Sequence, residues 1–184
     1  GYKIDNWDYQ HHGTQNMIQL LQKSNNIGAC QVGLWVGNKH LYRYADRFGF
    51  GKKLGVDLEG EEAGLLPSEE ERNDIRLCTV SFGQGISVTP LQMIGAYSSL
   101  ANGGFLMEPY VVERVLDQGQ TVMQHTPVVI NRVVSTNTAS LLISMLKQSV
   151  AEGESQYFNI DNYHISGKTG TAQIADSTGG YDPS

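Results

Sequence analysis

A polar break between two apolar runs brings a hydroxyl and two amides together at Ser24-Asn25-Asn26. Ser and Asn side chains bond to nearby backbone groups, so such a triplet usually does no more than cap a helix. A hydroxyl and an amide held at such a break can also relay a proton or bind a substrate amide. The triplet alone leaves capping and catalysis both open.

A second polar segment, Ser166 to Ala172, lies inside a strand-like run from Tyr163 to Ala175. As a strand, it would place its threonines on one face and Lys168 on the other, with a glycine between the threonines that permits close approach to the backbone. Such an edge can pair with an extended peptide. Hydroxyls and an ammonium can bind a carboxylate, and a free backbone N–H can stabilise an oxyanion.

Gly167-Lys168-Thr169 imitates the end of a phosphate-binding loop. That motif requires a glycine five residues before Gly167, where this sequence has Asn162. A phosphate-binding loop also lies between a strand and a helix. Because these residues lie within a strand-like run, we reject nucleotide binding.

Closely spaced glycines also mark Ser81 to Pro90, where they allow positive φ. Their spacing does not match Gly-x-Gly-x-x-Gly. A tight turn that leads into a capped helix explains most of this segment.

The composition limits the classes of function. The chain has 184 residues, of which 40% are hydrophobic, enough for one domain with a real core. A formal net charge of -6 argues against nucleic acid as a partner. Cys30 and Cys78 form no Cys-x-x-Cys motif and are interpreted as buried thiols. The histidines show no ligand spacing, so we expect no metal and no cofactor.

Periodicity and caps predict both helices and strands. Because these do not alternate regularly, we expect an α+β fold with a mainly antiparallel sheet flanked by helices, in one domain over residues 1–184. The expected helices are Thr14 to Lys23, one containing Ile27 to Leu34, one from Asn38, a helix start at Pro67 to Glu71, Pro90 to Ala101 with Thr89 as N-cap, and Ser135 to Glu152. The expected strands are Tyr110 to Leu116, Val128 to Val134 and Tyr163 to Ala175.

Taken together and in this order, the segments resemble the penicillin-binding protein and serine β-lactamase superfamily. Its signatures are Ser-x-x-Lys, Ser-x-Asn or a variant, and Lys-Thr-Gly. The second and third correspond to Ser24-Asn25-Asn26 and Lys168-Thr169-Gly170. Phe82 to Gln92 is similar to the class B, monofunctional branch, as are Phe48 to Gly51, Gly64 to Pro67 and Ala101 to Gly104.

The resemblance implies serine acyl transfer in peptidoglycan synthesis. A serine would attack the D-Ala-D-Ala bond of a stem peptide, and an amine of a neighbouring peptide would resolve the acyl-enzyme. The resemblance implies proton transfer for Ser24, orientation of the substrate amide for Asn26 and a positive charge for Lys168. It also implies that Thr169 and Thr171 bind a carboxylate beside Gly170. The Thr171 N–H would form half of the oxyanion hole.

The implied partners are stem peptides, β-lactams as covalent inhibitors, and a glycosyltransferase with other cell-wall synthesis proteins. The intact protein would be anchored in the cytoplasmic membrane and face outward.

The sequence departs from the family in one respect. No serine precedes Ser24, so the upstream Ser-x-x-Lys is missing. The match at Ser144 to Lys147 follows Ser24 and belongs to the apolar pattern of a long helix, so we discard it. We expect the nucleophile segment and the C-terminal strands and helix to lie outside this chain, which should not acylate as given. A β-lactam sensor, a silent scaffold and a carboxypeptidase stay open as alternatives.

Overall fold

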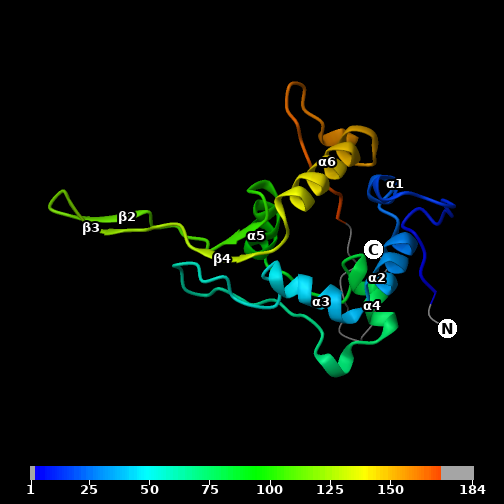
Figure 1. The fold of residues 1–184 in the computed structure, drawn as a ribbon, viewed down its shortest axis with the longest axis horizontal. Coiled ribbons are helices and arrows are strands. Elements are labelled where there is room, and N and C mark those ends of the chain that lie inside the picture. Colours follow the sequence, from blue (N-terminus) through cyan, green and yellow to red (C-terminus); the bar gives the residue numbers. More distant parts are fainter. Residues whose placement is uncertain (1–2, 171–184) are drawn as a thin grey trace. The chain divides into compact units, whose positions relative to one another are not determined.

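The computed structural model describes residues 3–170, which form two compact units. The first unit comprises described residues within 3–41, 67–86 and 143–170. The second comprises residues 42–66 and 87–142. Two helices, α3 (Asn38–Arg47) and α6 (Thr136–Glu152), contribute residues to both units (Figure 1).

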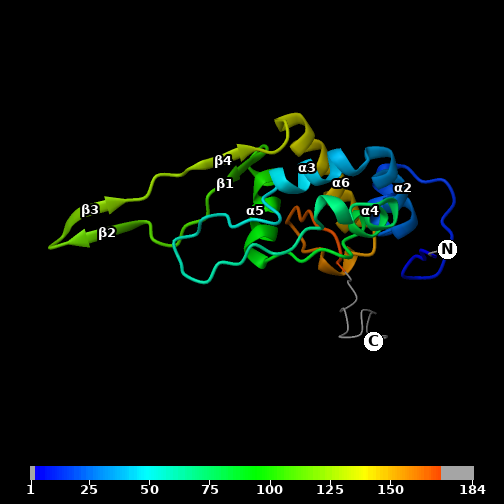
Figure 2. The same cartoon turned by 90° about the horizontal axis from the view of Figure 1, so that it is seen from below.

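The first unit is helical in its described part. It contains α1 (Met17–Gln22), α2 (Asn26–Val36), α4 (Asp74–Ser81), the second half of α6, and the short 3-10 helices η1 (Glu69–Glu71) and η2 (Gln156–Phe158). Figure 2 shows α2 and α4 side by side. Their contact is close because Gly33 lacks a Cβ, which would otherwise collide with the Ser81 hydroxyl.

The two cysteines lie at this contact. Cys30 of α2 and Cys78 of α4 form a disulfide with a Cα–Cα distance of 4.2 Å. The expectation of buried free thiols was therefore wrong. Periodicity placed Cys30 on the apolar face of a helix, but it predicted no helix around Cys78 and carried no information on which elements pack together.

The core of the second unit lies where α5 (Pro90–Ala101) meets a two-stranded sheet. Strand β1 (Phe105–Met107) pairs antiparallel with β4 (Val129–Arg132). The buried core residues are Leu54, Leu106 and Val133. Helix α5 has the predicted bounds, because Thr89 caps it and the Gln92 side chain completes the capping box.

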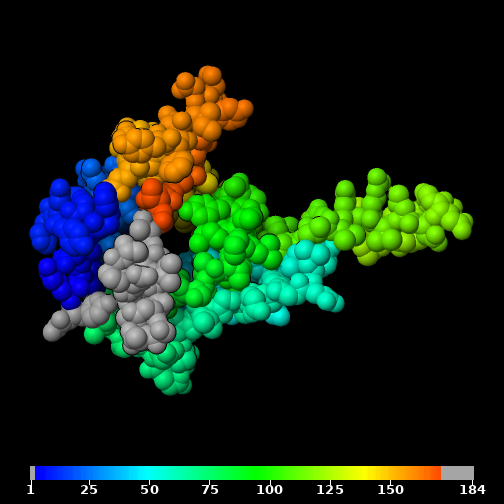
Figure 3. All heavy atoms as spheres, turned by 180° about the vertical axis from the view of Figure 1, so that it is seen from behind, coloured from blue at the N-terminus to red at the C-terminus, as the bar shows by residue number. Residues whose placement is uncertain are grey.

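A second antiparallel ribbon pairs β2 (Arg114–Asp117) with β3 (Gln120–Gln124). Gln118 and Gly119 connect the strands at positive φ, as tight hairpin turns require. Figure 3 shows this hairpin, in light green, extending from the rest of the second unit. Asp57 supports its base, accepting from the N–H groups of Val111 and Val112 at 2.8 Å each.

The expected α+β class with antiparallel pairing is confirmed, with corrections to individual elements. Helix α4 and strands β1 and β3 were not predicted, and the helix start at Pro67 is a single 3-10 turn. The strand expected over Tyr163 to Ala175 is wrong for its described part, because residues 163–170 form no strand. A strand needs a paired neighbour, whereas the Gly167 N–H bonds to the Leu146 carbonyl of α6.

Candidate active site

The turn between α1 and α2 carries the Ser24 triplet. Asn25, the middle residue, is the N-cap of α2; it is buried, and its side chain accepts from the Gly28 N–H at 2.9 Å. Ser24 has φ +47°, a conformation that non-glycine residues rarely adopt and that occurs preferentially at functional sites. Capping is thus performed by Asn25, so the side chains flanking it are available for other contacts.

The Lys168 ammonium donates to the Ser24 hydroxyl at 2.7 Å, although the residues are 144 positions apart. The same ammonium donates to the Thr169 carbonyl at 3.1 Å. The two signatures of the sequence therefore meet at a serine hydroxyl and a lysine ammonium, which together can hold and transfer a proton.

Helix α6 brings these two segments together. Ser149 is buried and donates from its hydroxyl to the Leu21 carbonyl at 3.2 Å, just before the Ser24 turn. Toward the other segment, the Ile143 carbonyl accepts from the Ser166 hydroxyl at 3.2 Å. The Leu146 carbonyl accepts from the Gly167 N–H at 3.4 Å. One helix thus binds both segments through its backbone and one hydroxyl.

The protonation of Lys168 is influenced by two opposing effects. Desolvation of its ammonium lowers the pKa of Lys168, although the residue as a whole is exposed. The nearby Glu154 carboxylate opposes this and raises the pKa, but the net result is a pKa below the usual value. This ammonium therefore gives up a proton more readily than a fully solvated lysine.

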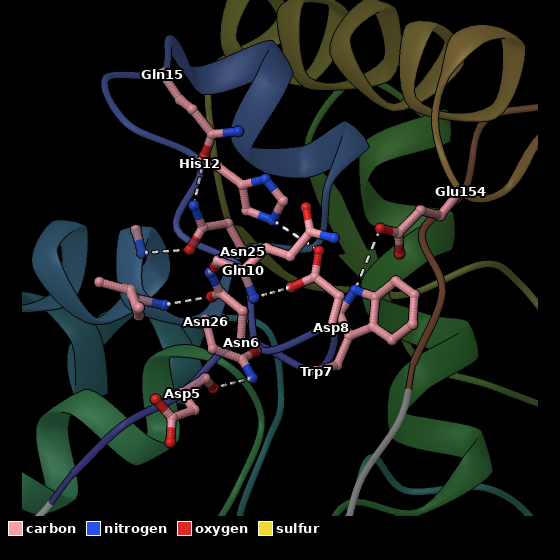
Figure 4. Close-up of polar contacts among 12 residues, drawn as sticks. Asp5, Asn6, Trp7, Asp8, Gln10, His12, Gln15, Asn25, Asn26 and Glu154 are labelled. Atoms are coloured by element: carbon pink, nitrogen blue, oxygen red, sulfur yellow. Dashed lines mark hydrogen bonds and ion pairs between the residues drawn. The ribbon is translucent and has the colours of Figure 1, made fainter.

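Of the other expected site residues, Asn26, Thr169 and Gly170 lie within the described part of the chain. The Asn26 amide donates to the Asp5 carbonyl at 3.2 Å, across to the N-terminal segment (Figure 4). Thr169 is half-buried, and a Cβ built at Gly170 would meet no atom within 4 Å. Thr171 lies outside the described residues.

Sequence reasoning missed Asp5, whose carbonyl accepts from Asn26, and Glu154, whose charge raises the pKa of Lys168. His164 is exposed and lines a pocket of about 270 Å³ with Lys147 and residues 159–163. Ser144 and Lys147 are exposed on α6.

Among residues 3–170, no three His, Cys, Asp or Glu side chains lie together as metal ligands would. No helix in this described range has the length and apolarity to cross a membrane.

Comparison with known families decides the identity. The model of the penicillin binding protein transpeptidase domain matches residues 1–184. This chain belongs to that family. The resemblance drawn from the motifs is confirmed, including its class B branch. As a penicillin-binding protein transpeptidase sequence, it carries two of the three signatures within its 184 residues.

Curated relatives of this penicillin-binding protein come from several bacteria. Stage V sporulation protein D of Bacillus subtilis is 37% identical over 175 residues, covering 94% of this chain and 27% of the relative. Penicillin-binding protein PbpB of Mycobacterium tuberculosis is 35% identical, covering 82% and 23%. Peptidoglycan D,D-transpeptidase FtsI of Escherichia coli is 30% identical, covering 95% and 28%. The chain thus spans about a quarter of the length of these relatives.

Solved structures agree with this assignment. Penicillin binding protein 3 from Mycobacterium tuberculosis, complexed with ampicillin, matches with a TM-score of 0.85 and 32% identity over 91% of this chain and 39% of that one. The D,D-transpeptidase domain of a peptidoglycan glycosyltransferase from Eggerthella lenta matches with a TM-score of 0.87 and 26% identity, over 93% and 45%.

Proposed function

We propose that the protein containing this chain is a peptidoglycan D,D-transpeptidase and a target of β-lactams. The observation that carries this proposal is the 2.7 Å hydrogen bond from Lys168 to Ser24, which joins the two family signatures in one site. The family match over residues 1–184 supports it. So does the relative named as a D,D-transpeptidase.

The reaction needs a nucleophilic serine in a Ser-x-x-Lys segment upstream of this chain. Its oxygen attacks the carbonyl carbon of the penultimate D-Ala, the C–N bond breaks, and the terminal D-Ala leaves as an amine that takes up a proton. An acceptor amine then attacks the acyl-enzyme, loses a proton and returns one to the serine oxygen. Crosslinking therefore needs no external energy source.

Each site residue has a proposed part in these steps. Ser24 relays protons between the nucleophile and its neighbouring lysine, and Lys168 keeps this hydroxyl hydrogen-bonded. Asn26 orients the amide of the stem peptide. Thr169 and Thr171 bind the carboxylate of the donor or drug beside Gly170, and the Thr171 N–H forms half of the oxyanion hole. The nucleophile's own N–H forms the other half.

The proposed setting is the outer face of the cytoplasmic membrane, where stem peptides, a glycosyltransferase and other cell-wall synthesis proteins would be partners. The Cys30–Cys78 disulfide supports this setting, because disulfides persist in oxidising compartments outside the cytoplasm.

The test uses a protein that carries this chain together with the upstream Ser-x-x-Lys segment and the downstream strands. After penicillin treatment, intact mass and peptide mapping should show one drug bound to a serine before Gly1, and none on the present chain alone. Incubation of a separate sample, not treated with the drug, with stem peptides should yield crosslinked product. Release of D-Ala without crosslinking would indicate a carboxypeptidase. Drug binding without any peptide reaction would indicate a sensor, and no modification at all would indicate a scaffold.

A further inference from the structure

The first turn of α2 has a backbone donor that the cap of the helix does not satisfy. A helix start leaves its first N–H groups without partners inside the helix, and the N-cap residue Asn25 accepts from that of Gly28 at 2.9 Å. The Ile27 N–H donates instead to the side-chain oxygen of Asn6 at 3.2 Å, across 21 positions of sequence. The turn that carries Ser24 is therefore held from the N-terminal segment.

Asn6 is itself fixed by its surroundings. It is only 3% exposed, and its side-chain nitrogen donates to the Gln10 carbonyl at 2.7 Å. Its backbone carbonyl accepts from the Tyr9 N–H at 3.0 Å, which closes a tight turn. Because a carbonyl only accepts and an N–H only donates, the Asn6 amide nitrogen faces Gln10 and its oxygen faces Ile27. The side chain of Asn6 thus has one defined orientation.

The residue next to Asn6 contacts a side chain of the motif. The Asp5 carbonyl accepts from the Asn26 amide nitrogen at 3.2 Å, and Figure 4 shows Asp5, Asn6 and Asn26 together. Since this carbonyl accepts only, it determines which end of the Asn26 amide faces it. The oxygen of that amide then lies on the other side of the group, where it can accept from a substrate N–H.

We propose that Asn6 is a positioning residue, whose buried side chain holds the first turn of α2 and keeps the Asp5 carbonyl on the Asn26 amide. This contact leaves the Asn26 oxygen as the acceptor for the amide N–H of a stem peptide or of an acylamino β-lactam. The inference rests on the proposed transpeptidase function for the role of Asn26. It assigns Asn6 no contact with substrate.

The experiment introduces Asn6→Ala into the protein that carries the upstream Ser-x-x-Lys segment and the downstream strands. Asn6→Asp is the conservative variant, because it keeps an acceptor for the Ile27 N–H at a helix start, where negative charge is favourable. Asn131→Ala is the matched control. It also removes a long-range bond from an Asn amide to the backbone, at 3.0 Å to the Arg47 carbonyl, but within the second unit.

Two readouts separate positioning from a loss of stability. The first is the ratio of two acylation rates, with benzylpenicillin, which has an acylamino side chain, and with aminopenicillanic acid, which has a free amine in its place. This ratio does not depend on how much of a variant is folded. The second is the exchange of the Asn26 side-chain amide hydrogens with water, followed by NMR and assigned with Asn26→Asp.

We expect Asn6→Ala to slow acylation by benzylpenicillin about threefold to tenfold more than acylation by aminopenicillanic acid, as for loss of one hydrogen bond. Exchange of the Asn26 amide hydrogens should become faster. Asn6→Asp should lie closer to the unmodified protein in both readouts, and Asn131→Ala should keep the original ratio.

An unchanged ratio or unchanged Asn26 exchange in Asn6→Ala would overturn the inference. So would the same change in Asn131→Ala, or an Asn6→Asp variant as impaired as Asn6→Ala. If the unmodified protein is acylated by neither compound, the proposed function fails, while the exchange of the Asn26 amide still decides the role of Asn6.

Discussion

Lys168 has both a defined position and a lowered pKa. It donates to the Ser24 hydroxyl at 2.7 Å, so its position is defined, and desolvation lowers the pKa of its ammonium. In the proposed mechanism, the ammonium supplies the positive charge for carboxylate binding below this lowered pKa. Above it, the neutral amine can no longer do so. The charge state of a single residue should therefore appear in the pH dependence of the reaction.

Lys168→Arg tests this property. A guanidinium stays charged over the whole accessible range, so acylation by the variant should lose the alkaline decline that the unmodified protein shows. At neutral pH the variant should acylate more slowly, because a planar guanidinium does not reproduce the geometry of the ammonium that donates to the Ser24 hydroxyl. Acylation rates measured from about pH 7 to about pH 11 would decide this. An identical decline in both proteins would assign the titration to another group.

The same pKa shift has a consequence for stability. Because the folded pKa of Lys168 lies below its unfolded value, the unfolded state binds more protons in the interval between them. The contribution of Lys168 to the free energy of unfolding therefore rises with pH across that interval, and Lys168→Arg should remove the rise.

Among the elements, α6 connects the two signatures. Its backbone and Ser149 bind Leu21 on one side and the Ser166 segment on the other. The approach at its end depends on a glycine, since a Cβ at Gly153 would collide with the Ser149 carbonyl and with Gln22. The separation of Ser24 and Lys168 is therefore set by a helix that carries neither residue.

Gly153→Ala should displace the turn before Ser24. The methyl group meets backbone atoms, which cannot rotate away, so we expect the free energy of unfolding to fall by about 1–3 kcal/mol and acylation to slow. Urea unfolding and acylation rates provide the measurements. Ala151→Ser, at an exposed position of the same helix, is the control and should change neither by much. Stability equal to that of the unmodified protein would show that the turn can move without cost.

Elements whose signals are local could be predicted, whereas those that depend on distant partners could not. Helix α5 was predicted to the residue because Thr89, Pro90 and Gln92 all lie within its first turn. The strand expected after Tyr163 was wrong because alternating side chains do not provide the partner that a strand needs. The Ser24 and Lys168 pair was proposed from motif order, but the contacts of α6 with both segments belong to no motif, and only the structure shows them.

At the scale of the molecule, the first unit is held together by a covalent link. Cys30 and Cys78 join α2, which begins at Asn26, to α4 across 48 residues of sequence. Closing a loop of this length restricts the unfolded chain, which stabilises the folded state. The helix that carries part of the candidate site is thus fixed to its neighbour by more than packing.

Replacing both cysteines by serine should lower the free energy of unfolding by about 2–4 kcal/mol. Urea unfolding of the oxidised protein, the reduced protein and the double variant would measure this, and the last two should resemble each other. If reduction leaves the unfolding midpoint of the unmodified protein unchanged, the disulfide contributes nothing to stability.

The contact between Lys168 and Ser24 is the central claim, and a double-mutant cycle on β-lactam acylation tests it most directly. Acylation rates are measured for the protein with its upstream Ser-x-x-Lys segment, for Ser24→Ala, for Lys168→Met and for the double variant. If the two side chains act as one unit, each single change should slow acylation strongly and the double variant should be little worse than either. Losses that simply multiply, or single variants that acylate at the original rate, would contradict the account.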